Sequence, residues 1–235
     1  KGIPTHGGNV GLEAQRVLDV RTVGQDGTAP TLLLKGAGTL AKQPFMSKMQ
    51  SASALVCYKA RGDVKPDVLV IGVGGGMDVM VAVSAGANSV IAVEINTAMV
   101  EMVTNRYDDY LDGLFRPNAH EYSKRLKLVN AEGRSFVRTQ DKKFDIIQMS
   151  GVDSFTALST GAYTLSEAYL YTTEAVKEFY DHLKDDGYIN YSRFLLSHPR
   201  KPRETLRLAN IGCTALEELG IENPQSHLVV FQGQD

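Results

Sequence analysis

The sequence lacks an excess of charge of either sign. Its 235 residues include 25 Lys and Arg against 27 Asp and Glu, so the formal net charge is −2 and the isoelectric point is near 6.2. Binding to nucleic acid relies on a positive field that attracts phosphates. The composition therefore predicts no nucleic-acid partner.

Clusters of metal-binding residues are missing as well. The two cysteines, Cys57 and Cys213, lie far apart and form no CxxC motif. The five histidines are scattered, and no two of them have the i, i+4 spacing that places two ligands on one helix face. The sequence predicts no metal site, and it predicts that both cysteines are small apolar residues of a protein in a reducing compartment.

Long apolar runs are also absent. A helix needs about 20 consecutive apolar residues to span a bilayer, and no segment approaches this length or resembles a signal peptide. We therefore expect a cytoplasmic protein. Because the chain begins at Lys1 in a polar, glycine-rich stretch, we also expect that it was cut from a longer one.

The chain is long enough to bury one sizeable core, since 43% of its residues are hydrophobic. Residues 1–43 predict a loose leader and a small β-hairpin, with strands in 14–24 and 30–40 around the turn signal GQDGTAP. Residues 44–235 predict the main domain, which begins with a helix in 45–60.

From residue 67 onward, segments typical of strands alternate with segments typical of helices. The predicted strands are 67–73, 89–95, 126–131, 144–150, 188–194 and 227–233. The predicted helices are 76–86, 97–111, 133–140, 172–183 and 203–219. Such alternation predicts an α/β fold with a mostly parallel sheet and helices on both faces.

A glycine cluster follows the first of these strands. It consists of Gly72, Gly74, Gly75 and Gly76, and Glu94 lies at the end of the next strand. In an open parallel sheet, ligands bind beyond the carboxyl ends of the strands, where glycines allow close approach and an acidic residue can accept hydrogen bonds from ribose. The cluster predicts a nucleoside-binding loop. The alternative interpretation is a tight strand-to-helix turn.

The spacing of the glycines leaves the identity of the nucleotide open. A GxGxxG dinucleotide fingerprint would have its third glycine at position 77, where this chain has Met77, and the spacing here is GxGxG. A Walker loop is excluded because no GK[ST] follows.

Four segments, VLVIGVGGGMDV, IAVEIN, NAEGRSF and FDIIQMS, occur in this order. Together they resemble the class I S-adenosylmethionine-dependent transferases, and more closely their spermidine-synthase-like branch, in which an aliphatic residue, here Val70, lies two positions before the first glycine. The C-terminal part resembles the cytosolic domain of bacterial spermidine-synthase-like proteins with a membrane-spanning portion upstream. The resemblance covers about residues 15–232, and it implies a Rossmann-like class I methyltransferase fold.

The resemblance also implies roles for single residues. The glycine loop would line the nucleoside and amino-acid parts of S-adenosylmethionine or decarboxylated S-adenosylmethionine, and Glu94 would accept hydrogen bonds from the ribose. Glu132 and Gly133 would contact the adenine. Asp78 would hold the amino end of the ligand; the alternative is a helix-start acid stabilised by the helix dipole.

The chain departs from the family pattern where an acceptor would bind. Aminopropyltransferases carry a DxxD pair after the fourth strand, and alignment on FDII places the first acid at Ser150 and the second at Asp153. The general base of that family is therefore missing, which argues against ordinary spermidine synthesis. Asp153 is the expected catalytic acid, with an Asx-turn as the alternative. Ser150 and Tyr163 are the other candidate catalytic residues.

Further residues of the predicted acceptor pocket come from the segment before the helix at 172–183. Tyr169 and Tyr171 would wall the pocket, and Glu167 is a weaker candidate acid. Core packing and a solvated helix start are the alternatives. The basic cluster HPRKPRE, residues 198–204, is either a solvated loop or, in a membrane-bound parent protein, a surface that faces anionic headgroups.

The sequence thus predicts a transferase that moves an aminopropyl or methyl group from a sulfonium donor to a small-molecule acceptor, expected to be an amine. The alternative is a catalytically inactive nucleoside-binding domain that serves a membrane protein as a sensor or scaffold. An attached membrane domain, which would hold the chain at the cytoplasmic face, and a homodimer are further expectations from the resemblance.

Overall fold

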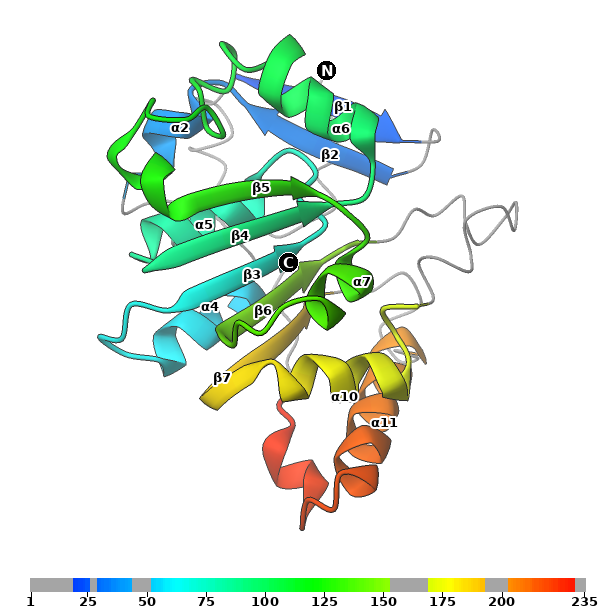
Figure 1. Cartoon of the computed structure of the whole chain (residues 1–235). Coiled ribbons are helices and arrows are strands. Elements are labelled where there is room, and N and C mark those ends of the chain that lie inside the picture. The colour runs from blue at the N-terminus through cyan, green and yellow to red at the C-terminus, as the bar shows by residue number, and fades with distance from the viewer. Residues whose placement is uncertain (1–18, 26–28, 44–51, 153–168, 193–202, 231–235) are drawn as a thin grey trace.

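The computed structural model describes residues 19–25, 29–43, 52–152, 169–192 and 203–230. Its centre is a five-stranded sheet in the order β5-β4-β3-β6-β7, in which all neighbouring strands are parallel (Figure 1). The strands are β3 (Asp67–Ile71), β4 (Ser89–Glu94), β5 (Leu126–Asn130), β6 (Phe144–Ser150) and β7 (Leu183–Ser192).

The order of the strands defines the fold. The chain runs from β3 through β4 to β5 at one edge and then returns to β6 and β7 on the other side, so the direction of winding reverses between β3 and β6. This is the Rossmann-like fold of the class I methyltransferases, and the predicted fold class is confirmed. Ligands of open parallel sheets bind at such a reversal, beyond the carboxyl ends of the strands.

Helices cover both faces of the sheet. In Figure 1, α7 (Gly133–Arg138) and α10 (Thr173–Asp181) lie in front of the sheet, and α4 (Ala52–Ala60) and α5 (Met77–Ser84) lie behind it. The central strands are therefore buried on both sides, and β3 and β6 are buried along almost their whole length, whereas the edge strand β5 is only partly buried.

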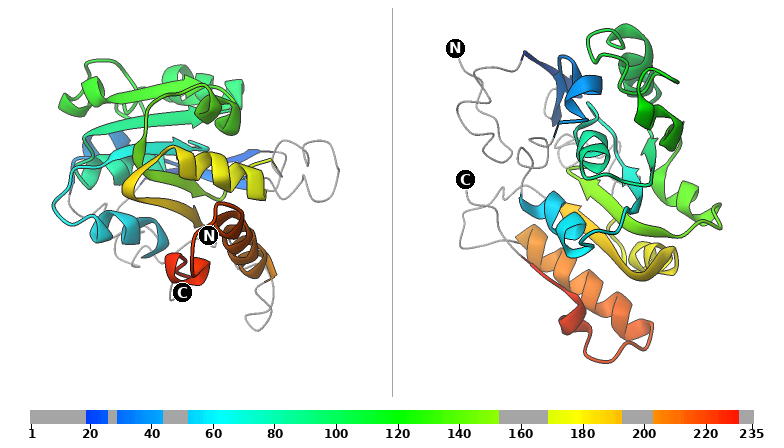
Figure 2. Two further views of the ribbon diagram at one scale, coloured as in Figure 1. Left: turned by 60° about the horizontal axis from the view of Figure 1, so that its bottom comes forward. Right: turned by 90° about the vertical axis from the view of Figure 1, so that its left-hand side faces the viewer.

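The remaining helices lie at the periphery. Helix α6 (Thr97–Glu101) continues as the π-helix η1 (Met102–Arg106), and the 3-10 helix η2 (Glu121–Arg125) precedes β5. Both views of Figure 2 show α11 (Arg203–Glu218) beside α10, and the 3-10 helix η3 (Pro224–His227) packs against α11. None of the helices within these described ranges is long and apolar enough to cross a membrane.

The N-terminal hairpin packs into the same core as the sheet. It consists of β1 (Val20–Gln25) and β2 (Ala29–Leu34), which are antiparallel, followed by the short helix α2 (Ala37–Leu40). Leu33 and Leu34 are buried in one hydrophobic cluster with residues of α5 and β3. The Thr39 hydroxyl donates to Asp112 at 2.6 Å, and the Tyr122 hydroxyl donates to the Gly38 carbonyl at 3.0 Å. These contacts connect the hairpin firmly to the main domain.

Two predicted elements differ near the start of the chain. Residues 35–40 were expected to continue a strand, but the chain turns at Gly36, which has a φ of 72°, and forms α2. The predicted helix 97–111 ends its regular part at Glu101 and becomes η1, followed by turns. The apolar spacing of these segments indicated burial correctly but not the backbone conformation.

Two further corrections concern the C-terminal half. Residues 184–187 were expected to separate a helix from a strand, but they lie within β7, where a register shift between Phe144 and Ile146 accommodates them as a bulge. Asp186 has a φ of 59° there. Residues 228–230 were expected in a last strand, yet they pair with no strand, and Val229 and Val230 are 78% and 61% exposed.

Candidate functional site

The glycine loop connects β3 to α5 at the point where the winding reverses. Gly72, Gly74 and Gly76 have φ values of 81°, 50° and 92°, which residues with a Cβ adopt only with strain. Gly75 is needed for a different reason. A Cβ at this position would overlap the Leu32 carbonyl oxygen of β2, so the hairpin lies directly against the loop.

Every backbone N–H group of residues 72–76 donates to an acceptor inside the protein. Those of Val73 and Gly74 donate to Oε2 of Glu94, at 3.0 and 3.1 Å. The N–H of Gly75 donates to the Thr31 hydroxyl of β2 at 2.7 Å. The first and last N–H groups of the loop donate to backbone carbonyls, at 2.8 and 2.9 Å. The loop therefore has no backbone donor left for a phosphate.

Glu94 fixes the shape of this loop. Its side chain is 7% exposed, and its second oxygen, Oε1, accepts a hydrogen bond from the N–H of Asn96 at 2.9 Å. A carboxylate offers about four lone-pair positions, so three backbone donors leave room for one more donor at Oε1. Ile95, the next residue, is 54% exposed and presents an apolar surface beside that position.

Glu132 is the N-cap of α7 in this structure. Its two carboxylate oxygens accept hydrogen bonds from the N–H groups of Arg134 and Ser135, at 2.9 and 2.7 Å, which satisfies donors that the helix leaves unpaired. Gly133 follows, and a Cβ there would overlap Ile71 of β3. Both residues thus lie at the carboxyl end of the sheet, and their contact with adenine stays a prediction.

Asp78 lies in the first turn of α5 and is 6% exposed. Tyr58 of α4 is buried on the same face of the sheet, and its hydroxyl has no hydrogen-bond partner among the described residues. Burial, and then the negative charge of Asp78, raise the pKa of Tyr58 well above its ordinary value. Because Asp78 follows Gly76 by two residues, it is a second buried carboxylate close to the glycine loop.

The carboxyl end of β6 lies next to the loop. A Cβ on Gly72 would come within 2.9 Å of the Val152 side chain, which follows this strand. Ser150 accepts a hydrogen bond from the Gln148 amide nitrogen at 2.7 Å. The predicted acids Asp153 and Glu167 and the predicted Tyr163 lie outside the described residues.

Tyr169 and Tyr171 have packing partners. The Tyr169 ring faces the Arg134 guanidinium at 4.8 Å, and the Tyr171 ring packs against Tyr191 at 5.8 Å. Arg134 in turn donates two hydrogen bonds to Glu178, at 2.6 and 2.8 Å. These bonds raise the pKa of Arg134 and lower that of Glu178. The Arg134–Glu178 ion pair thus connects α7 to α10 next to Tyr169, a predicted wall of the acceptor pocket.

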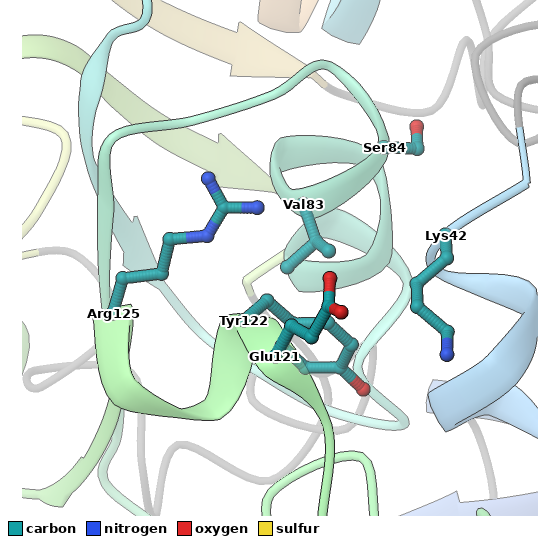
Figure 3. A pocket seen from close by; sticks show the side chains of 6 residues that line it. All are labelled: Lys42, Val83, Ser84, Glu121, Tyr122 and Arg125. Carbon is teal, nitrogen blue, oxygen red and sulfur yellow. The ribbon is translucent and has the colours of Figure 1, made fainter.

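A separate pocket of about 210 Å³ lies at the other end of α5. Figure 3 shows Arg125 and Lys42 on opposite sides of it, with Glu121 between them. Its walls include Val83 and Ser84 from the last turn of α5, whereas the glycine loop precedes the first turn. The pocket is thus distinct from the candidate site. Within the described ranges, His, Cys, Asp and Glu form no group of three that could hold a metal.

Sequence reasoning missed two polar residues at this end of the sheet, Thr31 and Gln148. Nothing in the sequence connects Thr31 with Gly75, since 44 positions separate them. Gln148 did give a signal, because it is a polar residue inside the otherwise apolar core of the strand FDIIQMS.

No protein-family model matches the chain, and no curated protein matches its sequence. The spermidine synthase from Thermotoga maritima superposes with a TM-score of 0.49 at 17% identity, over 86% of this chain and 60% of that one. A spermidine synthase in complex with the transition-state analogue AdoDATO gives 0.47 at 16% identity, with the same coverage.

A ribosomal protein L11 methylase from Lactobacillus delbrueckii subsp. bulgaricus gives a TM-score of 0.44 at 19% identity, over 70% of this chain and 65% of that chain. The chain thus spans about 60% of the length of the two spermidine synthases. These similarities concern overall shape, and the strand order establishes the fold independently of them.

Proposed function

We propose that this chain binds S-adenosylmethionine or its decarboxylated form and transfers a methyl or aminopropyl group to a small-molecule acceptor. The observation that carries the proposal is the closed hydrogen bonding of the glycine loop onto Glu94 at the reversal of the sheet.

The loop favours a cationic ligand over a phosphorylated one. Loops that bind phosphate present free backbone N–H groups to it, and here the N–H groups of residues 72–76 all have protein acceptors. The buried carboxylate of Glu94 adds negative charge at the loop, and Asp78 follows the loop in the first turn of α5. A pyrophosphate would be repelled there, whereas a sulfonium or ammonium group would be attracted.

The residues present fit the nucleoside part of such a donor. The remaining lone pair of Glu94 Oε1 can accept a hydrogen bond from a ribose hydroxyl. Exposed Ile95 can cover the face of a base. By resemblance, Glu132 and Gly133 contact the adenine and Asp78 holds the amino end of the ligand.

A sulfonium donor supplies a carbon that is already electrophilic. The protein then has to orient the acceptor and exclude water, and orientation alone can provide a large part of the rate. Ser150 occupies the position at which the family carries a base. Asp153 is our proposed acid for the acceptor, and we expect Asp153→Asn to lower turnover about 100-fold while donor affinity is preserved.

The second candidate function is a nucleoside-binding sensor or scaffold without catalysis. Ser150 in place of a base favours it. A membrane-bound bacterial parent protein, a location at the cytoplasmic face, a polyamine-like acceptor and a homodimer rest on the resemblance alone. Conversion of the donor to its thioether product, with any acceptor, would distinguish the transferase from the sensor.

Calorimetric titration with S-adenosylmethionine, its decarboxylated form, S-adenosylhomocysteine and NAD tests the ligand class. We expect saturable binding of at least one sulfonium donor and of the thioether, and no binding of NAD. Tight binding of NAD would contradict the proposal, because no backbone N–H group of residues 72–76 remains for its pyrophosphate.

A further inference from the structure

Gln148 is a polar side chain in the most buried part of the molecule. It is 1% exposed and lies in β6 between Val70 of β3 and Asn190 of β7, its register partners. Val70 is two positions before the first glycine of the loop. The carboxamide points toward the carboxyl end of the strand, because its nitrogen donates to the Ser150 hydroxyl at 2.7 Å.

The carbonyl oxygen of this carboxamide, Oε1, has no hydrogen-bond partner in the part of the chain that the structure describes. A buried polar atom without a partner costs stability, and native proteins keep few of them. A leucine at this position would fill the space without that cost. A buried polar group that lowers stability in this way is expected where the group binds a ligand.

Ser150 stands where the sequence resemblance expects a carboxylate base, and Gln148 donates a hydrogen bond to it. The pair is uncharged, and it offers one acceptor atom, the buried Oε1 of Gln148, in the strand whose carboxyl end lies next to the glycine loop. An amine reacts with a sulfonium carbon only in its uncharged form, which has both a lone pair and an N–H group. A carboxylate at this place would also stabilise the unreactive ammonium form, whereas a carboxamide has no net charge with which to do so.

We propose that Gln148 is a positioning residue of the acceptor site, whose Oε1 accepts a hydrogen bond from an N–H group of an acceptor amine that is uncharged at the working pH. The inference rests on the proposed function and narrows its substrate class. The nitrogen lone pair forms the new bond to carbon, and the electrons of the carbon–sulfur bond pass to sulfur, which becomes a neutral thioether. The nitrogen then holds one extra proton, which it releases to the proposed acceptor acid, Asp153, and from there to water. Gln148 takes no proton in this step.

The first test compares stability in Gln148→Leu and Met149→Leu. Met149 is equally buried but faces the opposite side of the sheet, so it controls for a change of side chain in this strand. If Oε1 serves a ligand, Gln148→Leu removes an unsatisfied atom, and its melting temperature should equal or exceed that of the wild type. A fall of more than about 5 °C in Gln148→Leu alone would show a structural role and overturn the proposal.

The second test uses two amines as probes in the presence of saturating S-adenosylhomocysteine. Aniline is uncharged at pH 7.5, and n-propylamine is an ammonium ion. The side-chain NH₂ signals of Gln148, assigned by their loss in Gln148→Leu, should shift saturably with aniline and stay unchanged with n-propylamine. Unchanged signals with aniline, or a larger shift with n-propylamine, would overturn the proposal.

A third test introduces a carboxylate in place of the carboxamide. We expect Gln148→Glu to reverse the preference, so that n-propylamine binds at least tenfold more tightly than aniline, and Gln148→Leu to weaken aniline binding at least tenfold. S-adenosylhomocysteine affinity should stay within about twofold of the wild type in Gln148→Leu. A wild type that fails to bind S-adenosylhomocysteine would contradict the proposed function, whereas normal binding with unselective amines would contradict only the role of Gln148.

Discussion

Carboxylates at the two ends of the central sheet are stabilised in different ways. At the amino end, Lys184 of β7 contacts Asp67 and Asp145 at 2.5 and 2.9 Å, and Arg61 contacts Asp145 at 2.5 Å. At the carboxyl end, Glu94 receives three backbone N–H groups, and no lysine or arginine within the described ranges forms an ion pair with it.

This difference separates stability from ligand binding. Asp67 and Asp145 each have a cation of the protein as partner, so the network holds α4, β3, β6 and β7 together. The charge of Glu94 is stabilised by dipoles and is not neutralised. Glu94 therefore remains an anionic group that a cationic ligand can use, and the changes below should affect the two ends differently.

The largest effect is expected from breaking the amino end. Asp145→Asn would leave the partly buried guanidinium of Arg61 without its carboxylate, and loss of one member of a buried pair costs about 3–5 kcal/mol. Urea unfolding should show this loss, with donor affinity unchanged. Exposed Asp181→Asn is the control. A loss of less than about 1 kcal/mol would mean that the network adds little to stability.

A somewhat smaller effect, on binding, is expected at the carboxyl end. Glu94→Ala removes the ribose acceptor and the clamp on the loop, and it should weaken donor binding by about 1.5–3 kcal/mol. Glu94→Gln keeps the shape of the side chain but not its charge. It should therefore weaken the binding of a sulfonium donor more than that of S-adenosylhomocysteine, whose sulfur is uncharged. Calorimetry measures both, and equal affinities of a folded Glu94→Ala protein and the wild type would exclude the ribose role.

Contact between the hairpin and the loop can be tested with a pair of glycines. Gly75→Ala would drive a Cβ into the Leu32 carbonyl oxygen, whereas a Cβ at Gly24 would meet nothing within 4 Å. We expect Gly75→Ala to lower the free energy of unfolding by about 2 kcal/mol and to weaken donor binding, because the hairpin or the loop must move. Gly24→Ala should leave both unchanged. Equal melting temperatures of the two variants would contradict this packing.

The smallest effect concerns acid stability. Burial disfavours the charge of Asp67, but hydrogen bonds from Lys184, Ser89 and Asn88 outweigh burial and hold its pKa below the ordinary value. A carboxyl group whose pKa is lowered in the folded state stabilises the protein above its unfolded pKa, near 4, and this contribution is lost as the pH falls below that value. Stability should therefore fall below pH 5, and Asp67→Asn should reduce that fall by about 1 kcal/mol. Chemical unfolding between pH 7 and 3 measures both slopes, and identical slopes would exclude Asp67 as the cause.

Local patterns in the chain were enough to predict the parallel sheet, its first four strands, the glycine loop and the position of Glu94. A central parallel strand is buried on both faces and must be apolar, and a loop with positive φ values requires glycine. Elements without such a pattern were predicted less well. The bulge at 184–187 in β7 depends on pairing with Phe144, about 40 residues away, and the sequence around it is typical of a turn.

The contacts of the site residues, in contrast, followed from the packing of distant segments. Glu94 was predicted to bind ribose. The three backbone N–H groups that donate to it reach it only because β4 pairs with β3. The hydroxyl of Thr31 meets Gly75 because the hairpin folds over the loop. Among the described residues, Gln148 Oε1 lacks a partner because of how the segments around β6 pack in the folded protein. Hydrogen bonds between segments distant in the sequence require the assembled fold, and no local pattern encodes them.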